Sequence, residues 1–270
     1  MRDLARRYDI RPSKALGQNF LIDPNLARAI AADAEVGPGS RVIEVGAGFG
    51  SLTLALAEAG AAEVVAIEFD RALIPALEEV VEGRSNVTVR HGDAMHMDLA
   101  SELQEAPWTL CANLPYNISV PLVLTVLASV PAVTRLVVMV QREVGERLVA
   151  GAGDEAYGAV SVRVAYRASA ATMRRVPPPV FWPRPRVESV VVRMDRLVSP
   201  PVEVAEERLW RVVDAGFAER RKTMRNALRR LGLDAAAADG ALADSGVGPS
   251  ARAEELSLST FATIAERIPA

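Results

Sequence analysis

Residues 41–50 read Arg41-Val-Ile-Glu-Val-Gly-Ala-Gly-Phe-Gly50, a short apolar run followed by three alternating glycines. A β-branched run of this length is typical of a buried strand. Glycines at the end of a strand allow a tight turn and let a ligand approach the backbone closely. The spacing is G-x-G-x-G, whereas dinucleotide folds usually show G-x-G-x-x-G. The stretch therefore predicts a strand, a turn that binds a nucleotide-like cofactor, and the start of a helix.

On the C-terminal side of this turn, short apolar runs alternate with helical patterns. Strands are expected at residues 64–67, 87–89, 108–112 and 136–140, and helices at residues 51–59, 72–81 and 121–130. Alternation of this kind is typical of βαβ units, whose parallel sheet is covered on both faces. Two late strands, at residues 172–176 and 187–194, are joined by a proline-rich loop and would add an antiparallel strand. The fold class predicted is α/β.

A change of pattern at Ser199-Pro-Pro201 marks a domain boundary. Beyond it, residues 204–230 are amphipathic and residues 258–268 form a last helix. We therefore expect a main domain at residues 1–198 and a small all-helical domain at residues 199–270.

The composition limits the classes of protein to which the chain can belong. Half of its 270 residues are hydrophobic, yet charged residues or prolines interrupt every apolar run that could span a bilayer. The first residues lack the apolar stretch of a secretory signal. A single cysteine, Cys111, excludes an intrachain disulfide framework. We expect a cytoplasmic protein, a monomer with no membrane partner.

Positive charge is unevenly distributed, although the net charge is −3. It gathers in three runs, which are Arg2, Arg6, Arg7, Arg11 and Lys14, then Arg174, Arg175, Arg184 and Arg186, and finally Arg220, Arg221, Lys222, Arg225, Arg229 and Arg230. Any one run is also typical of a solvated helix face. Three runs flanking one predicted site favour contacts with nucleic-acid phosphates.

Two acidic residues follow the next strands of the predicted sheet. Glu68 ends the second strand, near the distance from the glycines at which an acid accepts hydrogen bonds from ribose hydroxyls. Asp93 ends the third strand at the same edge, where a carboxylate can accept an adenine N–H. A solvated loop would explain either acid alone. Together with the glycines, the two acids favour a cofactor site.

The segment Asn113-Leu-Pro-Tyr116 follows the fourth strand. Methyl transfer to an amine needs a polar acceptor that orients the N–H groups and an aromatic face on which a flat substrate stacks. Asn113 supplies the acceptor and Tyr116 the face, while Pro115 stiffens the turn between them. The segment predicts a place where an amino group is presented to the cofactor.

A metal site is not expected. Cys111 lies inside an apolar strand and is interpreted as a small core residue. His91 and His96, without further ligands, do not make a zinc site.

Five segments, taken together and in order, give the chain a family resemblance. They are Lys14-Ala-Leu-Gly-Gln-Asn-Phe-Leu21, residues 44–50, residues 113–116, Pro183-Arg-Pro-Arg-Val-Glu-Ser189 and Phe217-Ala-Glu-Arg-Arg-Lys-Thr-Met-Arg-Asn226. Over residues 11 to about 268 the chain resembles the ribosomal RNA adenine N6-dimethyltransferase family. The resemblance implies a Rossmann-like sheet that uses S-adenosylmethionine, no metal, and a C-terminal helical domain that binds rRNA. In its bacterial small-subunit branch, it implies dimethylation of two adjacent adenosines near the 3′ end of 16S rRNA within a pre-ribosomal particle.

The resemblance also assigns roles to residues. It implies S-adenosylmethionine bound by Gln18, Asn19, Leu21, Gly46, Gly48, Glu68, Asp93 and Asn113. Tyr116 and Phe181 would stack the target adenine, which leaves its own stack to reach the methyl group. Asn113 and the Leu114 carbonyl would accept hydrogen bonds from its N6 amine. Residues implied to hold rRNA phosphates are Arg220, Arg221, Lys222, Arg225 and Arg229. Trp182 is an aromatic that this pattern does not require.

Three alternatives stay open. A large-subunit rRNA adenine methyltransferase that confers antibiotic resistance shares the chemistry, although segments 183–189 and 217–226 favour the small-subunit enzyme. A non-catalytic nucleic-acid-binding factor shares the fold, but does not need Glu68, Asp93 and residues 113–116. A dehydrogenase is disfavoured by the glycine spacing.

Overall fold

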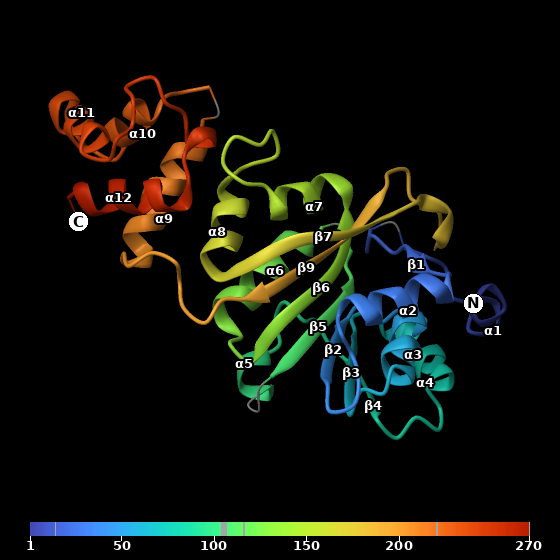
Figure 1. Ribbon diagram of the computed structural model, residues 1–270. Helices are drawn as coiled ribbons and strands as arrows, with labels where there is room; N and C mark the ends of the chain where they lie inside the picture. Colours follow the sequence, from blue (N-terminus) through green and yellow to red (C-terminus); the bar gives the residue numbers. More distant parts are fainter. Residues whose placement is uncertain (14, 104–106, 116, 220, 270) are drawn as a thin grey trace. The chain divides into compact units, whose positions relative to one another are not determined.

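A computed structural model describes residues 1–13, 15–103, 107–115, 117–219 and 221–269 (Figure 1). Contacts divide the chain into two units, the first formed by Met1–Gly145 with Ala170–Arg196 and the second by Glu146–Ser169 with Leu197–Ala270. The second unit thus takes in a segment that lies well before Ser199 in the sequence. No pattern in the sequence indicated that residues 146–169 belong to the second unit. The domain division at residue 199 stays a prediction.

The first unit is built on a seven-stranded sheet with the order β4-β3-β2-β5-β6-β9-β7 among the described strands. The strands are β2 (Arg41–Val45), β3 (Glu63–Glu68), β4 (Val87–His91), β5 (Trp108–Asn113), β6 (Val133–Gln141), β7 (Ala168–Val176) and β9 (Ser189–Arg196). The pairs among β2 to β6 are parallel, and β9 runs antiparallel to β6. The predicted α/β fold with a late antiparallel strand is confirmed.

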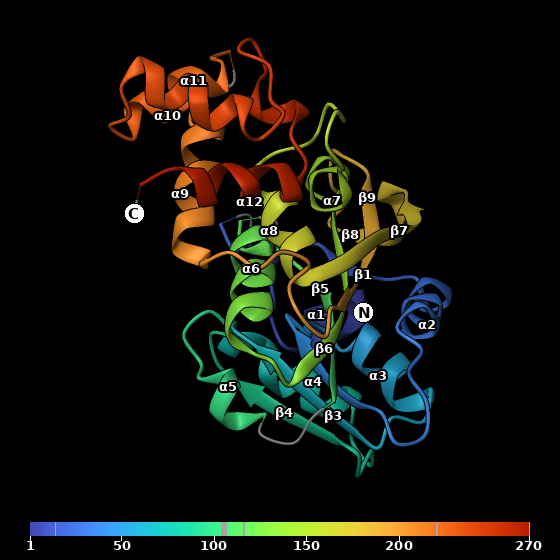
Figure 2. The same ribbon diagram turned by 60° about the vertical axis from the view of Figure 1, so that its left-hand side comes forward.

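Helices cover both faces of this sheet, as its doubly buried apolar strands require. Figures 1 and 2 show α2 (Pro24–Asp33) and α3 (Ser51–Glu58) side by side on one face and α6 (Ser119–Ser129) on the other. Helix α2 begins where the Asp23 carboxylate accepts hydrogen bonds from two N–H groups of the first turn. The remaining elements of the unit are α1 (Arg2–Arg7), β1 (Phe20–Leu21), η1 (Arg71–Leu73), α4 (Ile74–Val80), α5 (Leu99–Glu102), η2 (Pro178–Val180) and β8 (Phe181–Trp182), and α7 (Arg142–Val149) leads into the second unit.

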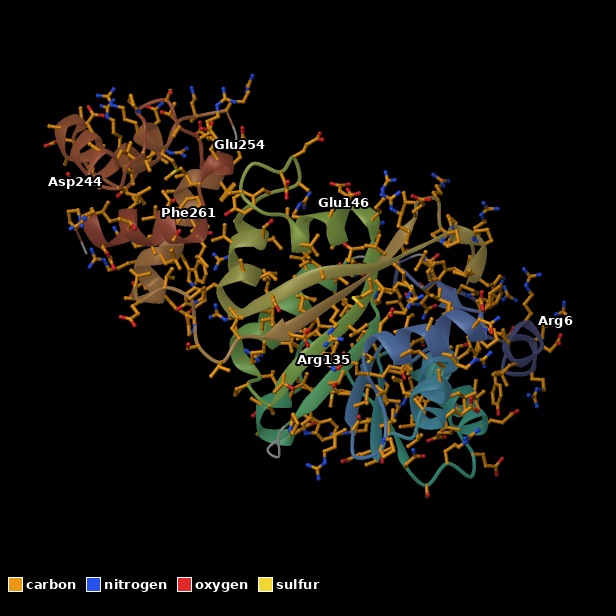
Figure 3. The ribbon with its side chains drawn as sticks, viewed as in Figure 1. Arg6, Arg135, Glu146, Asp244, Glu254 and Phe261 are labelled. Atoms are coloured by element: carbon orange, nitrogen blue, oxygen red, sulfur yellow. The ribbon has the colours of Figure 1, made fainter. Side chains whose placement is uncertain are left out.

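Charged side chains tie the end of α2 to the antiparallel side of the sheet. Arg135 of β6, labelled in Figure 3, donates to Asp195 and to Glu35 at 2.7 Å each. Arg193 of β9 donates to the second oxygen of each carboxylate, at 2.7 and 2.6 Å. The hydrogen bonds from Arg193 and Arg135 lower the pKa of Glu35. The network therefore anchors the C-terminal end of α2 against β6 and β9.

The second unit is helical. Its elements are α8 (Ala159–Arg167), α9 (Glu206–Phe217), α10 (Met224–Arg230), α11 (Ala235–Ala243), η3 (Ala253–Glu255) and α12 (Leu258–Arg267). Phe261 points into their shared core, where it is fully buried and lies 5.8 Å from the ring of Phe217 (Figure 3). Tyr157 donates to the Leu256 carbonyl at 2.9 Å. No helix among the described residues is both long and apolar enough to cross a membrane.

Arg196, the last residue of β9, closes the end of α6. Its guanidinium donates to the carbonyls of Val126, Leu127, Val130 and Val133 at 2.8–3.0 Å. Helix-end carbonyls such as that of Leu127 lack an intrahelical partner, so one planar group with several donors caps this end of α6 and also reaches Val133, the first residue of β6. Since α6 starts just after residues 113–116, this cap stabilises the helix that follows the predicted methyl-acceptor site.

Replacing Arg196 by Met should lower the free energy of unfolding by about 1–3 kcal/mol, because the variant cannot donate charged hydrogen bonds to the buried carbonyls. Arg196→Lys keeps a positive charge at the helix end but not the planar set of donors, so it should recover only part of the stability. Urea unfolding of the three proteins measures the effect. A Met variant as stable as the parent would show that the cap contributes nothing.

Candidate functional site

The site begins at the turn between β2 and α3. Gly46 and Gly48 have φ angles of 77° and 59°, in the left-handed region that favours glycine. A Cβ atom at Gly48 would lie 2.9 Å from the ring of Phe20, so the residue must also be small. The Gly46 N–H donates to the Ile67 carbonyl at 2.9 Å, which ties the turn to the neighbouring strand β3.

Glu68 ends β3 and faces this turn. Its carboxylate accepts hydrogen bonds from the Gly48 N–H at 2.7 Å and from the Asp70 N–H at 2.8 Å. The residue is only 6% exposed. Burial raises the pKa of Glu68, while the N–H groups of Asp70 and Gly48 act in the opposite direction. Each Glu68 oxygen keeps a lone pair for a ligand hydroxyl. Glu68 can therefore hold the glycine turn and bind a ribose at the same time.

Asp93 follows β4 at the same edge of the sheet. One carboxylate oxygen accepts from the Met95 N–H at 2.9 Å, and the other lies 2.8 Å from Nδ1 of His96. Burial alone would raise the pKa of Asp93, but these two hydrogen bonds and the His96 charge outweigh it, so the pKa is lowered. Asp93 is therefore an ionised acceptor at neutral pH.

The N-terminal segment, residues 15–21, closes the site from the other side. Gln18 donates to Asp70 at 2.8 Å and accepts from the Ser13 N–H at 2.7 Å. Two residues of the segment form β1, which pairs with β8 in an antiparallel two-stranded sheet. Asn113, at the end of β5, donates through Nδ2 to the Asn19 carbonyl at 2.9 Å. The nitrogen of the Asn113 amide is thereby engaged, and its oxygen is the atom left to accept a hydrogen bond.

These elements enclose a cavity of about 310 Å³. Eight of the residues predicted from sequence line it, namely Gln18, Asn19, Gly46, Gly48, Glu68, Asp93, Asn113 and Leu114. They come from three successive strand ends, the fourth strand end and the N-terminal segment. The structure therefore brings together most of the predicted cofactor site and the acceptor Asn113.

Two predicted residues are not at the cavity wall. Leu21 and Phe181 pair across β1 and β8, are each 4% exposed, and pack in a cluster with α2 and α3. The ring of Phe181 is covered in this structure, so stacking on a substrate base would require it to be uncovered. Its stacking role stays a prediction. Tyr116 and Arg220 lie outside the described residues.

Sequence reasoning did not single out two polar or exposed residues that line the cavity, Phe69, which is 55% exposed beside Glu68, and Asn117, which follows the predicted acceptor segment. It also missed Asp70, which lies next to Phe69 and accepts a hydrogen bond from Gln18. Phe69 and Asp70 directly follow an acid already singled out, so inspecting its neighbours would have found them. Nothing in the sequence links Gln18 to Asp70, because 52 residues separate them.

Glu44 lies within β2, beneath the glycine turn. It is 1% exposed, and its carboxyl group accepts a hydrogen bond from the Thr53 hydroxyl at 2.6 Å. Burial raises the pKa of Glu44 to about 8, with the Thr53 hydrogen bond acting against the shift and the Glu68 charge adding to it. Glu44 is therefore a neutral acid at pH 7 in the folded protein.

Among the described residues, no group of three or more His, Cys, Asp or Glu side chains is arranged to hold a metal ion. Cys111 is fully buried in β5, and burial raises the pKa of its thiol. The interpretation of Cys111 as a core residue is confirmed.

The predicted phosphate-binding run lies in the second unit around the start of α10. Arg221 and Lys222 are both exposed. Arg225 donates twice to the Asp239 carboxylate, which satisfies part of its charge within the protein. Since both side chains of this pair are well exposed, the pair is weak and can exchange for a phosphate contact.

Known proteins are similar to this chain in sequence and in fold. Residues 11–269 match the family described as ribosomal RNA adenine dimethylase. A ribosomal RNA small subunit methyltransferase A from Kineococcus radiotolerans is 46% identical over 275 residues, which cover 100% of this chain and 90% of that protein. A protein of the same name from Streptomyces griseus is 45% identical over 276 residues, covering 100% and 94%.

Solved structures resemble the chain as well. The 23S rRNA methyltransferase ErmE matches with a TM-score of 0.74 and 26% identity, covering 92% of this chain and 99% of that one. A dimethyladenosine transferase from Plasmodium falciparum matches with a TM-score of 0.74 and 23% identity, covering 91% and 95%. The match to the Plasmodium falciparum structure shows similarity of fold only.

The buried acid Glu44 makes stability depend on pH. Its folded-state pKa of about 8 lies above the ordinary value of 4.5, so its stabilising contribution is full below pH 4.5 and is lost as the pH rises through 8. In the neutral variant Glu44→Gln this loss should be absent. Relative to the variant, the parent should lose a few kcal/mol between pH 5 and 8, at about 1.4 kcal/mol per pKa unit.

Urea unfolding at several pH values measures this difference without any ligand. Glu58→Gln, which removes an exposed carboxylate of α3, is the control and should follow the parent at every pH. If the stability difference between Glu44→Gln and the parent stays constant from pH 5 to 8, Glu44 does not titrate in this range.

Proposed function

Because the chain belongs to the ribosomal RNA adenine dimethylase family, we propose that it transfers methyl groups from S-adenosylmethionine to the N6 amines of two adjacent adenosines near the 3′ end of small-subunit rRNA. The observation that carries the proposal is Asn113, whose amide is oriented by Asn19 at the wall of the cavity that also holds Glu68 and Asp93. We expect the protein to act as a monomer in the cytoplasm, on a pre-ribosomal particle.

The small subunit is favoured over the large one by the extent of similarity. Relatives named for the small subunit are 45–46% identical over the full chain, whereas the large-subunit enzyme ErmE is 26% identical. A non-catalytic binding factor is disfavoured, because such a factor needs neither the buried Glu68 carboxylate nor an oriented Asn113 at the cavity.

The residues present fit S-adenosylmethionine. Glu68 offers carboxylate lone pairs to ribose hydroxyls, and Asp93 offers an ionised acceptor to the adenine amine. The glycine turn leaves room for the close approach of a ligand, and Gln18 and Asn19 line the cavity from the N-terminal segment. When bound, this donor supplies a methyl group activated by a positively charged sulfur. The acidic side chains at the wall also favour a cationic ligand.

The acceptor amine is weakly nucleophilic, since its lone pair is delocalised into the adenine ring. The Asn113 oxygen and the Leu114 carbonyl accept hydrogen bonds from its two N–H groups and favour a geometry that exposes the lone pair. Leu114 is held for this role because its own N–H donates to the Met139 carbonyl at 3.1 Å. No strong general base is required, so positioning and electrostatics carry most of the acceleration.

Binding of the target base and its rRNA involves further residues. Stacking of the adenine is assigned to Tyr116 and Phe181, with Phe181 uncovered on binding. The phosphate backbone of the rRNA is assigned to the second unit, where Arg221, Lys222 and Arg229 lie around α10 and Arg225 can exchange its pair with Asp239. Distributed contacts of this kind dominate affinity and make it depend on salt.

Cofactor binding tests the first part of the proposal. Glu68→Gln should weaken S-adenosylmethionine binding by roughly 1–3 kcal/mol, the cost of removing a hydrogen bond to a charged acceptor. Titration calorimetry measures the affinity, and urea unfolding reports any loss of fold. Glu58→Gln is the matched control, because Glu58 is an exposed carboxylate paired with Arg84 outside the cavity. If Glu68→Gln and Glu58→Gln bind S-adenosylmethionine with equal affinity, Glu68 does not bind the cofactor.

Methyl transfer tests the second part. With radiolabelled S-adenosylmethionine, the protein should label unmethylated small subunits and not large subunits. Asn113→Ala should reduce the rate by orders of magnitude while particle binding is nearly unchanged, because the contact strengthens mainly in the transition state. Asn25→Ala, which removes an exposed amide of α2, should retain the parent rate. Labelling of large subunits alone, or an Asn113→Ala protein with the parent rate, would refute the proposal.

A further inference from the structure

A second hollow, outside the cofactor cavity, lies on the first unit beside the N-terminal helix. It has a volume of about 440 Å³ and is lined by Arg2, Arg6, Asp9, Ile10, Arg11 and Trp182. We call it the α1 groove. It combines cationic side chains from α1 and the residues after it with one aromatic ring from β8, and neither the cofactor nor the acceptor amine uses it.

The charge of the α1 groove is positive and accessible. Arg6, labelled at the surface of α1 in Figure 3, has a side chain 81% exposed and pairs with Asp3, itself 92% exposed. Arg11 is 90% exposed and lies 3.8 Å from Asp9. Exposed pairs of this kind contribute little, so both guanidinium groups can rebind to a phosphate. Arg2, the third arginine of the groove, is also exposed.

The groove is held in place by its own contacts. Arg7 and Tyr8 both donate to Glu79 of α4, and Tyr8 does so at 2.7 Å. Leu4, Ala5 and Ile10 are buried against the same cluster that contains Phe20 and Phe49. The three arginines therefore project from a helix docked on the first unit, so a ligand meets a preformed surface.

Trp182 forms the aromatic wall of the groove and connects it to the cofactor cavity. The ring is half-buried, with its centroid 6.2 Å from that of Phe20 and 6.5 Å from that of Phe49. Phe20 in turn lines the cofactor cavity. One layer of aromatic side chains thus separates the α1 groove from the cavity to which the target adenine is brought.

We propose that the α1 groove binds a single-stranded stretch of RNA that flanks the target adenosine, with phosphates on Arg2, Arg6 and Arg11 and one unpaired base stacked on Trp182. This combination of a positive groove and an aromatic platform is how proteins hold single-stranded nucleic acid. A duplex does not fit, because its bases are stacked on each other and present no face to an indole. The inference rests on the proposed function, since RNA chains reach this surface only if the site acts on RNA.

The charges are tested with the double variant Arg6→Ala/Arg11→Ala. Its matched control is Arg28→Ala/Arg84→Ala, which removes two exposed arginines that each bond one side chain outside the groove. Binding to unmethylated small subunits is measured at several salt concentrations. The double variant should bind about tenfold more weakly at low salt, and its salt slope should fall by about 1.4, at about 0.7 for each phosphate of a single strand that an arginine no longer neutralises. The control should match the parent, and equal effects in the two variants would overturn the proposal.

Trp182→Leu and Trp182→Phe test the stacking wall. Leucine keeps apolar packing on Phe20 and Phe49 but offers no aromatic face, so particle binding should weaken about tenfold, whereas phenylalanine should retain most of it. S-adenosylmethionine affinity should be the same in both variants. If Trp182→Leu weakens cofactor binding and leaves particle binding unchanged, Trp182 is only a packing residue and the proposal fails.

A competition experiment separates single strands from duplexes. A single-stranded RNA about ten nucleotides long, within the usual span of single-strand sites, should displace small subunits from the parent protein. It should lose this ability against Arg6→Ala/Arg11→Ala, while an RNA duplex of the same length should compete poorly. Equal competition by the duplex would overturn the single-strand assignment. These outcomes are distinct from failure of the proposed function, in which the parent protein itself would not methylate small subunits.

Discussion

The Glu68 carboxylate, accepting the N–H groups of Gly48 and Asp70, is the interaction on which the site depends. It fixes the glycine turn against the end of β3 and holds Asp70 where Gln18 reaches it. Gly48 in turn has no Cβ, which lets Phe20 pack against the turn. A single buried carboxylate thus determines the positions of the turn, the loop after β3 and the N-terminal segment that closes the cavity.

Burial of two acids on neighbouring strands, Glu44 and Glu68, carries an electrostatic cost, which protonation of Glu44 reduces. The raised pKa of Glu44 keeps it neutral at pH 7, which removes one negative charge from the neighbourhood of Glu68. With Asp93 ionised nearby, the cavity favours a cationic ligand over a neutral one. The overall charge of −3 is therefore compatible with an RNA partner, because the acids gather at the cavity and exposed arginines gather at the α1 groove and around α10.

Much of this site could be predicted from the sequence because parallel strands end at a common edge. Gly46, Glu68, Asp93 and Asn113 follow four strands, and the sheet order brings those ends together without any knowledge of side-chain contacts. The covering of Phe181 could not be predicted in this way. It results from a two-residue pairing with Leu21, which is too short to leave a periodic pattern and joins segments far apart in the chain. The grouping of residues 146–169 with the second unit has the same origin, since it arises from packing of α8 against helices much later in the sequence.

The N-terminal segment links parts of the mechanism that lie on different strands. Asn19 accepts the N–H of Asn113, so in the proposed mechanism the amide oxygen, rather than its nitrogen, faces the incoming amine. Phe20, the next residue, packs on the glycine turn on one side and on Trp182 on the other. Asn19 and Phe20 thus contact the glycine turn, orient the Asn113 amide and support Trp182 of the α1 groove. A shift of these two residues would therefore alter the proposed cofactor binding, amine orientation and RNA contact together. Chemistry that relies on positioning rather than on a strong base requires such coupling, since the methyl donor, the amine and the RNA backbone must be aligned at the same moment.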